Sequence, residues 1–172
     1  STREANFYAL EGESFSHSVQ FQVDYQLLRR FDLRLAYRWL DVKTDYRGVL
    51  LSRPLIAGHR AFANFAYETK NKWKFDYTVQ WLGKQRIPDT SLNPDGYQLP
   101  AYAPDYVLMN AQVTKDFSNR WSVYAGVENI NNFTLNRPII ASEEPFSPYF
   151  DSSLVWGPIF GRMAYAGFRY RL

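Results

Sequence analysis

Alternation of apolar and polar residues is strictest in one segment near the start of the chain. It reads Phe31-Asp32-Leu33-Arg34-Leu35-Ala36-Tyr37-Arg38-Trp39. The odd-numbered positions are apolar or aromatic, and the even-numbered ones are Asp, Arg or Ala. Because successive side chains of a β-strand point to opposite faces, this period of two predicts a strand with one apolar face and one ionic face.

The same period recurs along most of the chain, and no helical periodicity competes with it. Further strands are expected at residues 15–27, 60–68, 73–81, 107–113, 121–127 and 164–172, with residues 6–10 as an eighth candidate. No composition shift marks a domain boundary. We therefore expect one all-β domain of seven or eight strands over residues 1–172.

The connections between these strands alternate in length. Short links at residues 28–30, 69–72 and 116–120 alternate with long ones at residues 43–58, 83–105 and 131–161. In an up-and-down antiparallel sheet this places the tight turns at one end and the long loops at the other. Transmembrane β-barrels of bacteria have this asymmetry, with short periplasmic turns and longer extracellular loops.

Composition narrows the function classes. The chain has no cysteine, and only His17 and His59 could serve as catalytic or ligating imidazoles, neither in a recognisable motif. We therefore expect no enzyme activity, no metal and no cofactor. The net charge of +3 is spread along the sequence, which excludes a basic stripe for nucleic acid. Aromatic residues make up 18% of the chain, a high share that requires an explanation.

A soluble sandwich and a membrane barrel would both produce this alternation, and the spacing of the aromatics favours the barrel. Phe31 and Trp39 are eight positions apart, as are Trp73 and Trp81. At roughly 3.3 Å per residue and a tilt of about 40°, eight residues span roughly 20 Å along the membrane normal, close to the apolar band of a barrel. The expected aromatic girdle consists of Phe31, Trp39, Trp73, Trp81 and Trp121. The soluble sandwich remains an alternative.

The chain end adds a further signal. It reads Ala166-Gly167-Phe168-Arg169-Tyr170-Arg171-Leu172, and it is similar to the C-terminal signal by which outer-membrane strands are recognised for assembly, with Gly167, Tyr170 and Leu172 as its elements. Leu172 stands where Phe is usual. Two other segments, Gly58-His59-Arg60-Ala61-Phe62-Ala63-Asn64 and Gly126-Val127-Glu128-Asn129-Ile130, complete the pattern. With residues 31–39, they make the chain resemble the C-terminal barrel portion of TonB-dependent receptors.

This resemblance implies an outer-membrane barrel of about 22 strands that holds a plug domain. It also implies TonB-dependent uptake of a siderophore or haem, cobalamin or an oligosaccharide, with membrane lipid and the TonB complex as partners. The plug, the short TonB-contacting motif and the first strands are absent from these 172 residues. A self-contained eight-stranded outer-membrane barrel with a structural or adhesive role is the alternative, and it requires residues 6–10 to be a full strand.

Long loops are the expected ligand contacts, because loops of this length without regular structure are usually functional. Residues 131–161 are rich in aromatics beside acidic residues. The candidate contacts are Arg86, Tyr97, Tyr102, Tyr149, Phe150 and Trp156. Packing of these aromatics against one another over the barrel mouth is an equally weighted alternative, and nothing in the sequence selects a ligand.

Overall fold

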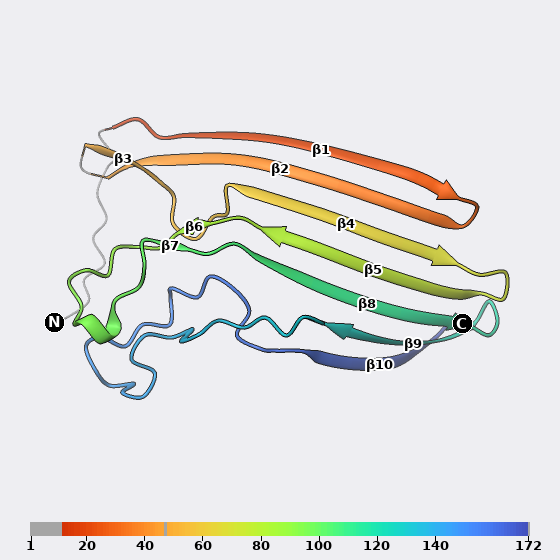
Figure 1. Ribbon diagram of the computed structural model, residues 1–172. Coiled ribbons are helices and arrows are strands. Elements are labelled where there is room, and N and C mark those ends of the chain that lie inside the picture. The colour runs from red at the N-terminus through yellow and green to blue at the C-terminus, as the bar shows by residue number, and fades with distance from the viewer. Residues whose placement is uncertain (1–11, 47, 172) are drawn as a thin grey trace.

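The computed structural model describes residues 12–46 and 48–171, which form one broad antiparallel sheet of long strands (Figure 1). The strands are β1 (Phe15–Leu28), β2 (Phe31–Tyr46), β3 (Val49–Ser52), β4 (His59–Glu68), β5 (Trp73–Leu82), β6 (Gln85–Arg86), β7 (Tyr102–Ala103), β8 (Tyr106–Asp116), β9 (Trp121–Glu128) and β10 (Met163–Tyr170). Their order in the sheet is β1-β2-β4-β5-β8-β9-β10, with β3 added beside β2, and β6 pairs with β7 separately. The predicted all-β, up-and-down architecture is confirmed.

In the described part of the chain, the helical content is a three-residue 3₁₀ turn, η1 (Asp95–Tyr97). Within residues 12–46 and 48–171, no helix has the length and apolarity to cross a membrane.

Short and long connections lie at opposite ends of the sheet, as the sequence predicted (Figure 1). The strand bounds need one main correction. β2 does not stop near Trp39 but runs on to Tyr46 and forms a hairpin with β3, inside the segment expected to be a loop. Gly48, with φ of 84°, lies in the turn of this hairpin and donates its N–H to Asp45 Oδ1 at 2.8 Å. Residues 6–10 lie outside the described part of the chain.

The extension of β2 continues the alternation with the opposite phase. It reads Leu40-Asp41-Val42-Lys43-Thr44-Asp45-Tyr46, so its apolar side chains stand at even-numbered positions, whereas those of residues 31–39 stand at odd-numbered ones. Because neighbouring side chains of a strand point to opposite faces, the apolar and polar sides exchange faces after Trp39. The charged side chains of the extension then share one face, where Lys43 Nζ pairs with the Asp41 carboxylate at 3.4 Å, and Tyr46 on the other face lies under Arg86.

One face of the sheet, the apolar face, carries the aromatic rows. Phe31 stacks on Phe65 with ring centroids 6.5 Å apart, and Tyr67 stacks on Phe75 at the same distance. No second sheet of the described residues covers this face, and Phe21 remains 66% exposed. The sandwich alternative is therefore wrong for this part of the chain, because a sandwich buries such rows in a dry core.

The predicted girdle residues all lie on the apolar face. Phe31, Trp73 and Trp121 are the first residues of β2, β5 and β9, at the short-turn end. Trp39 and Trp81 lie toward the long-loop end of β2 and β5. Contact of these rings with the membrane interface stays a prediction.

The opposite face, the polar face, is held by cross-strand polar contacts. Arg34 Nε donates to Asp24 Oδ1 at 2.5 Å, between directly paired residues of β2 and β1. Asn64 Nδ2 donates to both oxygens of Asp76 at 3.0 Å. Farther along the sheet, the Tyr165 hydroxyl donates to Gln112 Oε1 at 2.9 Å.

Two glycines permit close packing between the last two strands. Gly126 of β9 is paired with Tyr165 of β10, and Gly167 of β10 is paired with Tyr124 of β9. A Cβ at either glycine would overlap the phenol ring of its partner. Each tyrosine ring therefore lies across the glycine opposite it, which shows a packing role for the Gly167 of the expected assembly signal. The signal itself stays a prediction, and Leu172 lies outside the described residues.

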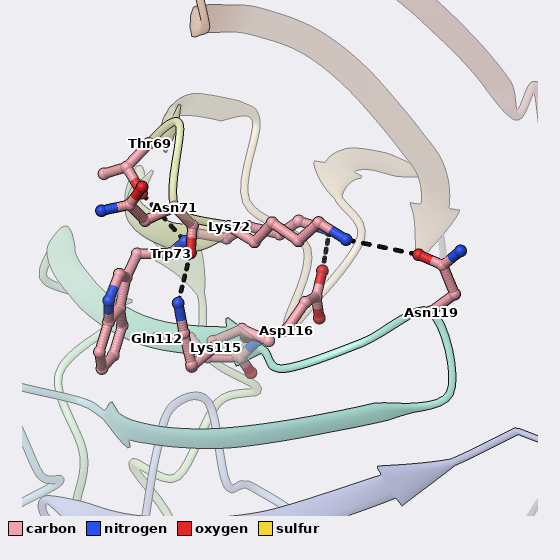
Figure 2. A network of polar contacts seen from close by, with 10 residues as sticks. Thr69, Asn71, Lys72, Trp73, Gln112, Lys115, Asp116 and Asn119 are labelled. Carbon is pink, nitrogen blue, oxygen red and sulfur yellow. Dashed lines mark hydrogen bonds and ion pairs between the residues drawn. The ribbon is translucent and has the colours of Figure 1, made fainter.

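The short-turn end is closed by a polar network (Figure 2). Lys72 Nζ donates to Asn119 Oδ1 at 3.4 Å, which links the turn after β4 to the turn after β8. Lys115 Nζ donates to the Asn71 carbonyl, and Lys74 pairs with Asp116 at 2.9 Å. These contacts join β5 to β8 at the end of the sheet away from the long loops.

Candidate functional site

The long connections build a structured cap, which we call the loop crown: residues 53–58, 83–105 and 129–162. All buried side chains of the described residues belong to the crown or to Tyr106, the first residue of β8. They are Ala57, Gln85, Ile87, Thr90, Ala103, Tyr106, Asn129, Leu135, Ile140 and Ala141. The crown therefore has a core of its own.

An aromatic cluster forms the centre of that core. The rings of Tyr106 and Phe133 are stacked at 4.8 Å with an interplanar angle of 5°, and Trp156 lies 5.9 Å from Tyr106. The buried Gln85 amide donates to the Trp156 carbonyl at 3.0 Å. Stacked aromatics add to the stabilisation from apolar burial. The cluster fixes the returning half of the 129–162 segment above β8.

Asparagines anchor the base of the same segment, and we call Asn129, Asn131 and Asn132 the asparagine anchor. Asn129 is buried, accepts a hydrogen bond from the Phe133 N–H at 2.9 Å and donates to the Phe133 and Phe160 carbonyls at 2.7 and 3.2 Å. Its φ of 52° lies in the left-handed region, which Asn tolerates better than most residues.

The other two members of the anchor bind neighbouring backbone. Asn131 Nδ2 donates to the Val107 carbonyl at 2.7 Å, and Asn132 Oδ1 accepts the Arg162 N–H at 2.8 Å. Arg162 in turn donates from Nε and Nη2 to the Ile130 carbonyl at 2.9 and 2.6 Å. Both ends of the long loop are thereby fixed to each other and to β8.

A cavity of about 370 Å³ lies between the two longest connections. One wall is formed by residues 96–99 and the other by Arg137 and residues 139–143. Tyr97 lines it and is stacked on Tyr149 at 5.8 Å, while the Arg137 guanidinium donates to the Gly96 carbonyl at 3.4 Å. Arg137 and Ala141 both have positive φ, 56° and 51°. Left-handed backbone at non-glycine residues is strained, and such residues cluster at ligand sites.

The charges around the cavity are mixed. Burial, and then the negative charges of Glu144 and Glu143, raise the pKa of the Tyr97 phenol. The Tyr97 hydroxyl therefore stays protonated at neutral pH and can donate a hydrogen bond. Together with the Arg137 guanidinium, it gives the cavity two donors beside an aromatic surface.

The six predicted contact residues separate into distinct groups. Tyr97 and Tyr149 meet at the cavity, whereas Trp156 belongs to the aromatic cluster. Arg86 lies over the Tyr46 ring at 5.2 Å and donates to the Ser52 carbonyl, so it fastens β6 to the β2–β3 hairpin. Its paired residue, Tyr102, is exposed. Phe150 is half-buried and donates its N–H to the Ser147 carbonyl at 3.1 Å.

Several residues of the site were not singled out by the sequence. Arg137, Gln85 and Tyr106 stand in no motif, and their roles depend on loops that meet only in three dimensions. Asn129 did carry a signal, because it belongs to the Gly126–Ile130 segment that supports the family resemblance. Mutual packing of the aromatics is observed for Trp156, which lies 5.9 Å from Tyr106, and for the Tyr97–Tyr149 pair, whereas ligand contact stays a prediction.

Comparison with known proteins agrees with this architecture. Residues 3–130 match the family described as TonB dependent receptor-like, beta-barrel. No curated relative matches the sequence. Among solved structures, the chain is similar to the ferric citrate transporter FecA in its unliganded form, with a TM-score of 0.66 and 16% identity. That match covers 90% of this chain and 24% of FecA.

Two further structures are similar in the same way. The ferric enterobactin receptor PfeA from Pseudomonas aeruginosa gives a TM-score of 0.68 at 16% identity, over 91% of this chain and 22% of PfeA. The closed form of the ferric-catecholate import receptor Fiu from E. coli K12 gives 0.60 at 10% identity, over 88% and 20%. The chain spans about a quarter or less of these structures, and at such identities they show a shared fold. With the family match over most of its length, the chain belongs to the TonB-dependent receptor-like β-barrel family of the bacterial outer membrane.

Proposed function

We propose that this chain is the C-terminal part of the barrel of a receptor that takes up a nutrient actively across the outer membrane. The observation that carries the proposal is the loop crown: an ordered cap with its own core and a cavity of about 370 Å³, at the end of the sheet that holds the long loops. In bacterial barrels the long loops are extracellular. The cavity would then face the medium from which the nutrient is taken.

Among siderophore or haem, cobalamin and oligosaccharide, we favour a ferric chelate as the substrate. The similar structures are a ferric citrate transporter, a ferric enterobactin receptor and a ferric-catecholate import receptor, so all three are named for ferric compounds. The cavity supports this choice, because Tyr97 and Arg137 offer hydrogen-bond donors to the oxygen atoms that surround iron in such chelates.

We propose that a plug domain and the first strands of the barrel precede the chain in the full-length receptor, and that the TonB complex acts on that preceding part. The polar face, with Arg34, Asp24 and Asp76, would surround the plug as a watery lumen.

Uptake by the full-length receptor tests the proposal. We would express it in a bacterial host that lacks its own ferric-chelate receptors and measure uptake of radiolabelled ferric citrate and ferric enterobactin. Accumulation in a host with TonB, and its loss in an isogenic host without TonB, is the expected result. Equal accumulation in both hosts, or none of either compound, would contradict it.

Variants of two cavity residues test whether the transported chelate binds in the cavity of the loop crown. Tyr97→Phe removes the hydroxyl donor and Arg137→Gln removes the guanidinium, and each should weaken binding of the transported chelate. Arg53→Gln serves as the matched control, because Arg53 is exposed and outside the cavity lining. Unchanged chelate binding by both cavity variants would place the contact elsewhere.

The self-contained eight-stranded barrel is the second candidate. It requires residues 6–10, outside the described part, to close the sheet against β10. In the described residues the sheet is open, with β1 and β10 at its two edges. A folded 172-residue monomer in detergent, resistant to protease along both edge strands, would favour this alternative.

A further inference from the structure

The polar face carries two arginines that oppose each other directly. Arg38 of β2 is paired with Arg60 of β4, and Gln20 of β1 lies on the other side of Arg38. Directly opposite residues have Cβ atoms about 4.5–5.5 Å apart, and like charges at such positions repel. Both side chains are exposed on a face that lines the interior of the barrel.

Neither arginine has an acidic partner among residues 12–46 and 48–171. The ion pairs found there are Arg34 with Asp24, Lys43 with Asp41, and Lys74 with Asp116. Arg34 lies on the same strand and face as Arg38, but its charge is compensated by Asp24, the residue directly opposite it on β1. That pair is four residues from Arg38 along β2, roughly 13 Å at the usual strand rise.

A hollow marks the place where a partner would sit. It encloses about 180 Å³, and its lining combines the polar side chains of Arg38, Arg60, Gln20 and Gln80 with apolar ones such as Phe62. Its charged groups are therefore two guanidinium ions, and its amides can add donors. Guanidinium groups bind planar oxyanions through two parallel hydrogen bonds, and two of them at cross-strand distance can share one carboxylate or phosphate.

We propose that Arg38 and Arg60 together bind one oxyanion inside the barrel, just below the loop crown. A carboxylate is the simplest such group. It would come either from an acidic side chain of another part of the receptor that fills the lumen, or from a free anionic solute that passes through it. With either source, the negative charge lies between the two guanidinium groups and offsets their mutual repulsion.

The test uses the full-length receptor, purified in detergent, with citrate as the probe. We would compare the wild type, the double variant Arg38→Gln with Arg60→Gln, and the control Arg34→Gln. If the anion is a free solute, calorimetry should show citrate binding that weakens about tenfold or more in the double variant, because a charged hydrogen bond is lost at each position. The control should bind citrate as the wild type does.

If the anion belongs to the receptor itself, the wild type should not respond to citrate. Arg60→Gln should then lower the melting temperature, and hydrogen exchange should rise in the luminal segment that supplies the acid. The inference is overturned if citrate has no effect and Arg60→Gln melts at the same or a higher temperature, since removing an unbridged cation only relieves repulsion. The site depends on the orientation of the sheet and not on uptake, and the two are measured separately, so either can fail alone.

Discussion

The loop crown and the strand sheet bury apolar surface in different ways. Leu135 in the crown is 8% exposed and packs among other protein atoms, whereas Leu35, at the centre of the apolar row from Phe31 to Trp39, is 44% exposed on the apolar face. We expect lipid to cover that exposed face in the outer membrane, where backbone polar groups must be satisfied by strand pairing. One chain would then combine a core of the kind found in water-soluble proteins with a sheet whose apolar face is buried by the bilayer.

Truncation of a leucine to alanine in each region, at Leu135 and at Leu35, should give the largest difference in stability between the crown and the sheet. Leu135→Ala should destabilise the crown by about 2–5 kcal/mol, because a cavity is left in packed protein. Leu35→Ala should cost far less, because lipid chains move into the vacated space. Hydrogen exchange of crown amides and thermal unfolding of the full-length receptor in lipid provide the measurement. Equal losses at the two sites would refute the comparison.

A charge placed on each region should give a complementary result. Leu35→Arg puts a cation at the centre of the apolar row from Phe31 to Trp39, where we expect the bilayer midplane, and should cost about 2–4 kcal/mol there. The matched change Leu92→Arg, at a crown side chain that is 97% exposed, should be close to neutral. Folding into lipid vesicles, followed by the gel-mobility difference between folded and unfolded barrels, reports the effect. A well-folded Leu35→Arg variant would argue against contact with lipid.

The asparagine anchor offers a test within the crown. Asn129→Ala removes the side-chain bonds to Phe133 and Phe160, leaves buried groups unsatisfied and should cost about 1–3 kcal/mol. Exchange of the Phe133 amide should accelerate, while the sheet amides stay protected. Asn119→Ala in the short turn after β8 is the control and should leave the crown unchanged. Slow exchange at Phe133 in the Asn129 variant would show that the anchor is redundant.

The smallest effect is expected where crown and sheet meet. The Trp81 indole N–H donates to Asp105 Oδ2 at 3.0 Å, and this bond holds the pKa of the Asp105 carboxyl below its usual range. The bond stabilises the folded protein fully at pH values above the pKa that Asp105 has in the unfolded chain. This stabilisation is lost as the pH falls through the lower pKa that Asp105 has in the folded protein. Acid titration of tryptophan fluorescence should show this step in the wild type and not in Asp105→Asn. An identical titration in both proteins would assign the step to another group.

Much of the sheet could be predicted because its two faces meet different environments along most of their length. The alternation in residues 31–39 and 73–81 located β2 and β5 and placed their aromatic rows on one face. Even Phe62, an exception to the alternation, takes the position that strict alternation requires, on the polar face opposite Ala36 and Gln80. The β2–β3 hairpin was missed because the phase of the alternation reverses after Trp39, so residues 40–46 do not continue the odd-numbered apolar row of residues 31–39.

The crown could be predicted only in outline. Loop length and aromatic content pointed to residues 131–161, but which rings meet depends on the path of the backbone. Trp156 and Tyr97 look alike in the sequence, yet one is packed in a core and the other lines a cavity. Arg137 gave no signal, because its place in the cavity wall depends on a turn with positive φ and on a second loop more than thirty positions away.

The two tyrosines that lie across glycines also bear on how the end of the chain finds its alignment. Tyr124 opposes Gly167, and Tyr165 opposes Gly126, so each ring needs a partner without a side chain. A slip of two residues would keep the inward and outward faces correct but would press both rings against side chains. The apolar and polar alternation is the same in both registers, so it does not distinguish the correct pairing from one shifted by two residues. The two tyrosine–glycine pairs do distinguish them, and they would disfavour misaligned pairing of these strands during insertion.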